Sequence, residues 1–83
     1  MPFIESKDRR KELDRIVNEM VLQGVKANGD LNYVLYKFCK YHVATSYNVL
    51  KNFLGELHEC ESQCRNDFLV PYEEKKRQEN GDV

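Results

Sequence analysis

The sequence predicts an all-α fold, a small three-helix arrangement with a long third helix and a short polar C-terminal helix or tail. Three observations predict it. Apolar side chains recur every three or four residues over most of the chain, which is the period of an amphipathic helix. The two prolines and four glycines fall mostly at the boundaries of these periodic segments. A residue that favours a helix N-cap precedes each of the three long segments.

The first helix is expected over residues 7–26. Ser6 is suited to cap it, and Asp8 lies in its first turn, where the helix dipole favours a negative charge. Asn28 and Gly29 tolerate positive φ and are expected to end it. Its apolar stripe consists of Leu13, Ile16, Val17, Met20, Val21 and Val25.

The second helix is expected over residues 31–43, with Asp30 as its N-cap. Tyrosines and lysines flank its apolar stripe, so this helix is aromatic on more than one side. A fully solvated helix face rarely carries so many aromatic rings. The stripe consists of Leu31, Val34, Leu35, Phe38, Cys39 and His42.

The third helix is the longest, over residues 47–69, and follows a break and N-cap at Thr45 and Ser46. Its apolar residues lie near a seam that repeats every seven residues, and about three heptads is the lower limit for a coiled coil. We therefore expect this seam to pair with a second copy of the chain. The candidate seam residues are Leu50, Phe53, Leu54, Leu57, Cys64 and Phe68.

Pro71 is expected to end or kink the third helix, because the residue before a proline avoids the α region. It is also suited to the first position of a further helix. The segment 72–79 carries charged and polar residues without an apolar stripe, and Gly81 lies just past it. This segment is either a short polar helix or a frayed tail.

Composition limits the classes of function. With 13 basic and 14 acidic residues, the formal net charge of −1 argues against nucleic-acid binding, which needs a basic excess. No apolar run approaches the roughly 18 residues that span a membrane. Residues 1–5 carry charge where a signal peptide needs its apolar stretch. Three cysteines without a secretion signal indicate reduced thiols, so we expect a cytoplasmic protein.

The length of 83 residues indicates a single domain, residues 1–83, with a small core. A chain of this size buries only a little over about 60% of its unfolded surface, and small domains recover stability through disulfides, a metal or a partner subunit. A homo-oligomer is therefore the expected state.

Two cysteine and histidine pairs raise the question of a metal. Cys39 and His42 are three residues apart, and Cys60 and Cys64 are four apart, so an antiparallel packing could offer zinc four ligands. However, no tight Cys-x2-Cys knuckle occurs, and Cys and His on an apolar stripe are usually core residues. We expect no metal and no cofactor, with a zinc-stapled domain as an alternative.

No catalytic group is evident. Cys60 and His58 point roughly 200° apart on a helix, so they cannot act as a nucleophile and base. The carboxylates Glu56, Glu59 and Glu61 are typical of a solvated face. We therefore expect that the protein is not an enzyme.

The tyrosine–lysine cluster of the second and third helices is the candidate binding site. Tyrosine is enriched at protein interfaces, which favours a protein partner. Tyrosine rings with lysines could instead stack a nucleotide and hold its phosphates, or the rings could cap the core. The cluster consists of Tyr33, Tyr36, Lys37, Lys40, Tyr41, Tyr47 and Lys51.

Residues 29–83 carry a set of segments that is most distinctive at the ending, namely 29–34, 46–47, 54–60, 71–76 and 79–83. These segments resemble a family of short, uncharacterised prokaryotic and phage proteins. The family has no assigned activity, so the resemblance implies only a phage or mobile-element context.

Together these observations predict a non-catalytic helical protein that self-associates and binds a host or phage protein through its aromatic face. An alternative is an oligomeric sponge for a small nucleotide signal, of the kind that counteracts a defence system.

Overall fold

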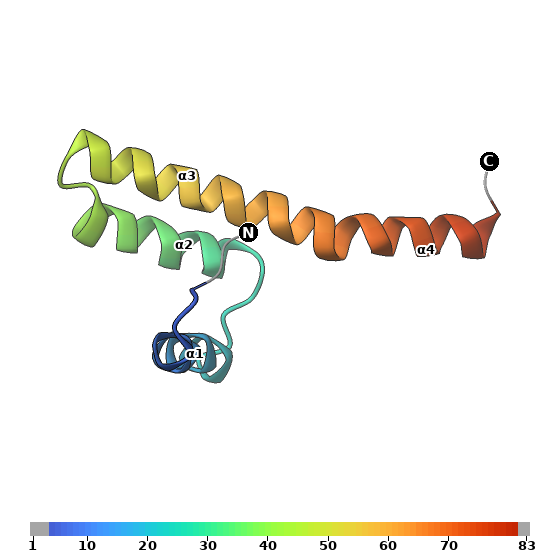
Figure 1. Ribbon diagram of the computed structural model, residues 1–83, viewed down its shortest axis with the longest axis horizontal. Helices are drawn as coiled ribbons and strands as arrows, with labels where there is room; N and C mark the ends of the chain where they lie inside the picture. The colour runs from blue at the N-terminus through green and yellow to red at the C-terminus, as the bar shows by residue number, and fades with distance from the viewer. Residues whose placement is uncertain (1–3, 82–83) are drawn as a thin grey trace. The chain divides into compact units, whose positions relative to one another are not determined.

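The computed structural model describes residues 4–81, and these residues contain helices, turns and bends but no strand (Figure 1). This confirms the all-α fold class. From its length we expect a single domain; the described residues divide into two compact units, residues 4–53 and 54–81, which are described separately. The elements are α1 (Lys7–Leu22), α2 (Gly29–Phe38), η1 (Cys39–Val43), α3 (Tyr47–Cys64), η2 (Arg65–Leu69) and α4 (Val70–Asn80).

Helix α1 begins as its capping pattern indicates, and Ser6 Oγ accepts a hydrogen bond from the Arg9 amide at 3.2 Å. The expected end at residue 26 is wrong, because α1 ends at Leu22. Gly24 there has φ 72° and donates its N–H to the Val21 carbonyl, while the next N–H, of Val25, bonds to the carbonyl five residues earlier. This pair of bonds is a Schellman ending, which needs a left-handed residue that glycine adopts without strain.

The N-cap of α2 is Asn28, so the expected cap at Asp30 is also wrong. Asn28 Oδ1 accepts a hydrogen bond from the Asp30 amide at 2.8 Å. The Asp30 carboxylate instead accepts one from the Lys26 amide at 3.2 Å. The chain leaves the first helix at Gly24, so α2 begins earlier than expected. Its N-cap is Asn28, and Asp30 lies in its first turn.

The second helical segment ends in a π turn. η1 follows α2 directly, and the Ala44 amide bonds to the Cys39 carbonyl at 2.8 Å, five residues earlier. Val43 in this turn is 8% exposed and is the one buried residue within residues 4–81.

Ser46 caps α3, since its Oγ accepts a hydrogen bond from the Val49 amide at 3.3 Å. The expected helical segment 47–69 is present as α3 and η2, but the expected break at Pro71 is wrong. The backbone stays helical into α4, and Val70 keeps φ −62° and ψ −48° directly before Pro71. A proline in a regular α-helix clashes with the carbonyl four residues earlier and offers no N–H. The wider π turn before Pro71 accommodates both effects.

Packing in unit 4–53 is shallow. The Phe38 ring lies 6.0 Å from the His42 ring and 6.3 Å from the Phe53 ring, so η1 and the start of α3 meet α2 around one phenylalanine. The other inward-facing apolar residues are only half-buried. They are Leu13, Met20, Val25, Leu31, Leu35, Cys39, Leu50 and Phe53.

Candidate interaction surfaces

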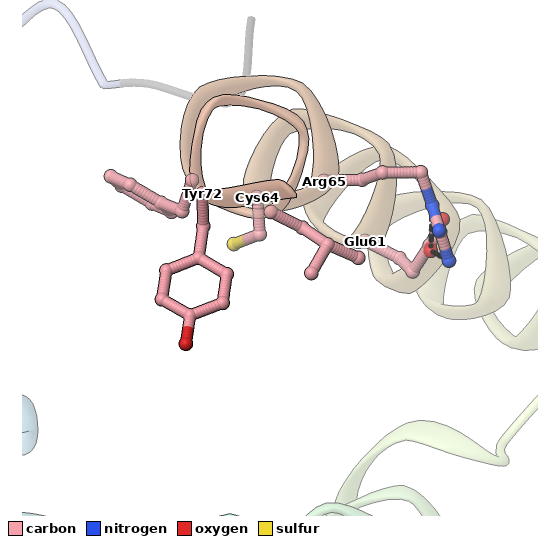
Figure 2. Close-up of a pocket in the computed structure, with 6 residues that line it drawn as sticks. Glu61, Cys64, Arg65 and Tyr72 are labelled. Atoms are coloured by element: carbon pink, nitrogen blue, oxygen red, sulfur yellow. Dashed lines mark hydrogen bonds and ion pairs between the residues drawn. The ribbon is translucent and has the colours of Figure 1, made fainter. Parts of the chain in front are cut away.

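The first candidate surface lies on the helical run of unit 54–81. A groove of about 480 Å³ follows this run (Figure 2). We call it the seam groove. It is lined by Glu61, Cys64, Arg65, Phe68, Leu69 and Tyr72.

The seam groove contains two of the seam residues that the heptad pattern indicates, Cys64 and Phe68. Leu54 and Leu57 lie earlier in the same unit, and Leu54 is 55% exposed. By contrast, Phe53 belongs to the other unit and packs against Phe38.

The heptad pattern does not indicate Tyr72 as a seam residue, although it lines the seam groove. The expected break at Pro71 placed Tyr72 outside the helix, whereas the unbroken helix carries it onto the groove. A four-residue spacing from Cys64 through Phe68 to Tyr72 was the signal that could have found it.

An ion pair borders the seam groove. Arg65 Nε donates to Glu61 Oε1 at 2.8 Å, and Arg65 Nη2 bonds to the same oxygen (Figure 2). The side chains of Arg65 and Glu61 are 56% and 49% exposed, so water screens the pair. An exposed i, i+4 pair contributes only about 0.3–0.5 kcal/mol to helix stability.

The Cys64 thiol in the groove is not activated. Desolvation raises its pKa, and the hydrogen bond with Cys60 and the negative charges of Asp67 and Glu61 raise it further. A raised pKa keeps the thiol protonated at neutral pH, and only the thiolate is a nucleophile. Cys64 therefore contributes an apolar contact surface rather than chemistry.

The second candidate surface is part of the tyrosine–lysine cluster. Lys37 Nζ lies 5.5 Å from the Tyr33 ring centre and 5.9 Å from that of Tyr41, and donates a hydrogen bond to Tyr33 Oη at 3.2 Å. Lys40 Nζ lies 5.4 Å from the Tyr41 ring centre. These contacts hold the two rings along one face of α2 and η1 by cation–π attraction.

A groove of about 780 Å³ runs along this face. It is lined by Tyr33, Val34, Lys37, Phe38, Tyr41 and His42. The structure thus brings together Tyr33, Lys37 and Tyr41 of the expected cluster. The remaining exposed members do not line this groove, although Lys40 contacts the Tyr41 ring; they are Tyr36, Lys40, Tyr47 and Lys51.

The third surface is the outward side of α1. Ile16, Val17, Val21 and Leu22 are between 56% and 79% exposed, although the sequence pattern places the first three on the stripe that faces the core. A groove of about 450 Å³ beside them also receives Val34 of α2. The stripe of α1 is therefore only partly covered.

The residues proposed for zinc do not form a metal site in the described chain. Between residues 4 and 81, no three His, Cys, Asp or Glu side chains are grouped so that they could hold a metal ion. His42 stacks on Phe38, and Cys60 interacts with Cys64. In the same range, no helix is long and apolar enough to span a membrane.

The fold and these surfaces describe a small all-α protein whose described grooves are lined largely by apolar and aromatic side chains. A family model described as a domain of unknown function (DUF6899) matches residues 1–83, and the chain belongs to this family. No curated protein matches the chain, and no solved structure matches it. The family assignment agrees with the expectation of an uncharacterised family.

Proposed function

We propose that the protein is a non-catalytic helical interaction protein that self-associates in order to complete its fold. One observation supports this above all: Val43 is the single buried residue among residues 4–81, while large apolar side chains on every helix are exposed. Exposed contiguous apolar surface marks interaction sites in soluble proteins.

The groove that Tyr33, Lys37 and Tyr41 of the tyrosine–lysine cluster line is the proposed binding site for a partner protein other than a second copy of the chain. Tyr33 and Tyr41 are 62% and 61% exposed, and Lys37 Nζ lies 5.5 and 5.9 Å from their ring centres. Tyrosine is enriched among the residues that contribute most to binding at protein interfaces. The resemblance to phage and prokaryotic proteins favours a host or phage protein in the cytoplasm as this partner.

Light scattering after size exclusion, followed by sedimentation equilibrium at micromolar concentration, tests self-association. We expect a mass at least twice the 9.8 kDa of one chain. A single well-folded chain at every concentration, with a cooperative unfolding transition, would contradict the proposal.

A second candidate function is binding of a small nucleotide by the oligomer. The observation in its favour is the pair of ammonium groups, Lys37 and Lys40, beside tyrosine rings that line a groove. A thermal-shift screen with ATP and a cyclic dinucleotide tests it, because ligand at 100 times its Kd adds about 2.7 kcal/mol of stability. A shift that disappears in Tyr33→Ala and Tyr41→Ala supports this function, and no shift contradicts it.

A further inference from the structure

We infer that the seam groove is occupied by the seam groove of a second copy, with the two helical runs antiparallel and with Glu61 of each chain paired to Arg65 of the other. This inference rests on the proposed self-association and assigns its interface and orientation. A two-fold axis would cross the seam level with residues 62–63.

The lining of this groove is mostly apolar and exposed. Phe68 is 70% exposed and Tyr72 is 58% exposed, and both lie on the same groove as Cys64. Leu54 lies two helical turns before Glu61 and therefore extends the same face. Aromatic side chains of this size dominate interface energetics when they become buried.

The charge pattern favours an antiparallel pairing over a parallel pairing in register. Glu61 lies on the seam between Leu57 and Cys64, so a parallel copy would place two Glu61 carboxylates opposite each other. Like charges that face each other across an interface cost several kcal/mol. The groove lining offers one cation to offset this repulsion, Arg65 of the same chain, which already bonds to Glu61.

In an antiparallel arrangement, the two Glu61 carboxylates do not face each other. With the axis level with residues 62–63, Glu61 of one chain lies opposite Cys64 and Arg65 of the other, so each carboxylate gains an arginine from its partner. The same register sets Leu57 opposite Phe68, and Leu54 opposite the turn that contains Pro71 and Tyr72. Charges are therefore paired at the centre, and apolar residues meet apolar residues on both sides.

The raised pKa of Cys64 fits this position. A neutral thiol beside a carboxylate can be covered without burying a further charge, whereas a thiolate there would face Glu61 and Asp67. The seam groove thus carries one balanced ion pair and no other charged lining residue.

Mixing two charge variants tests the cross-pairing. Glu61→Lys makes both charges at the seam centre positive, and Arg65→Glu makes both negative. Alone, each variant should self-associate at least about tenfold more weakly than the natural chain. In an equimolar mixture, native mass spectrometry should show heterodimers, with a Kd within about threefold of the natural chain.

The pair Arg9–Glu12 on α1 gives a matched control. Its side chains are 57% and 59% exposed, and its Nη1–Oε2 distance is 3.0 Å, close to the values of the seam pair. Glu12→Lys and Arg9→Glu should leave self-association unchanged, alone or mixed. Far-UV circular dichroism checks that all four variants keep their helices.

Distance measurement between spin labels tests the orientation. We would replace the three cysteines with alanine and label Gln78→Cys, which lies near the end of α4. At about 1.5 Å per residue, the antiparallel arrangement places the two labels roughly 45 Å apart, whereas parallel helices in register bring them within about 20 Å. Asn66→Cys, near the axis, should give a short distance in either arrangement.

The outcomes separate the two proposals. A chain that remains single at every concentration overturns the proposed function itself. A self-associating chain whose charge variants neither weaken alone nor recover in the mixture overturns the Glu61–Arg65 exchange. A short Gln78 label distance overturns the antiparallel orientation.

Discussion

At the scale of single residues, Phe68 is the most exposed aromatic side chain within unit 54–81, at 70%. Truncation of a phenylalanine that becomes buried costs several kcal/mol. We expect Phe68→Ala to weaken self-association by about thirtyfold, which corresponds to about 2 kcal/mol. Sedimentation equilibrium measures this change.

Val70→Ala provides the matched control for Phe68, since Val70 is 49% exposed in the same unit but does not line the seam groove. It should change the Kd by less than about threefold. Equal effects of the two substitutions would show that the seam is not specific.

The Cys64 thiol yields a prediction about pH. Since its pKa is raised, first by desolvation and then by Cys60, the thiolate forms only at a higher pH than in a free thiol. Any stability that the protonated thiol contributes is present at neutral pH and is lost as the pH rises through the raised pKa. We expect the rate of alkylation by iodoacetamide to rise at a higher pH for Cys64 than for free cysteine.

Cys60→Ala removes the hydrogen bond that supports this shift, so the alkylation profile of Cys64 should move to lower pH. Peptide mapping by mass spectrometry gives the rate at Cys64 alone. A profile below that of free cysteine in the natural chain would contradict the geometry of the cysteine pair.

At the scale of elements, Gly24 ends α1 and decides where α2 can begin. Its φ of 72° is strained for any residue with a Cβ, although an added Cβ would meet nothing within 4 Å. We expect Gly24→Ala to lower the free energy of unfolding by about 1 kcal/mol through backbone strain alone. Urea denaturation followed by circular dichroism measures the change.

Substitution of Gly55, within α3, should have the opposite effect on stability. Gly55 has helical backbone geometry without positive φ, and an added Cβ there also meets nothing within 4 Å. Gly55→Ala should therefore raise the free energy of unfolding by roughly 0.5–1 kcal/mol, because alanine loses less backbone entropy in a helix. If Gly24→Ala raised the free energy of unfolding as Gly55→Ala does, the left-handed ending of α1 would be refuted.

At the scale of the whole molecule, folding and association should be linked. A chain with one buried residue in its described part gains most of its apolar burial from a partner. The midpoint of thermal unfolding should then rise with protein concentration, since each tenfold increase adds about 1.4 kcal/mol to a dimer.

Differential scanning calorimetry over a hundredfold range of concentration tests this linkage. Phe68→Ala should shift the midpoint downward at every concentration and keep the dependence. A midpoint that is constant over the range would indicate that each chain is stable alone.

Much of the helical pattern could be predicted from local signals. Ser6 and Ser46 cap α1 and α3 as their positions indicate, and Gly81 follows the last helix. The expected helix boundaries are wrong where two local signals disagree. Gly24 favours a helix end, although the apolar period continues through Val25. Pro71 favours a break, although the chain remains helical through the π turn that precedes it.

The candidate sites were harder to predict, because they depend on which side chains remain uncovered. The heptad pattern indicates Cys64 and Phe68 but not Tyr72, whose place depends on the helix continuing through Pro71. Similarly, Lys37 could be placed near Tyr33 by its four-residue spacing, whereas Tyr47 and Lys51, on another helix, do not join that groove.

The sequence by itself determined the all-α class and the caps of α1 and α3, because these depend on groups within one or two helical turns. Only the tertiary structure decided that the stripe of α1 is half-covered, that Phe53 turns toward Phe38 and that Phe68 remains in solvent. The physical reason is that periodicity shows which residues share a face, while burial depends on whether another element is close enough to cover that face.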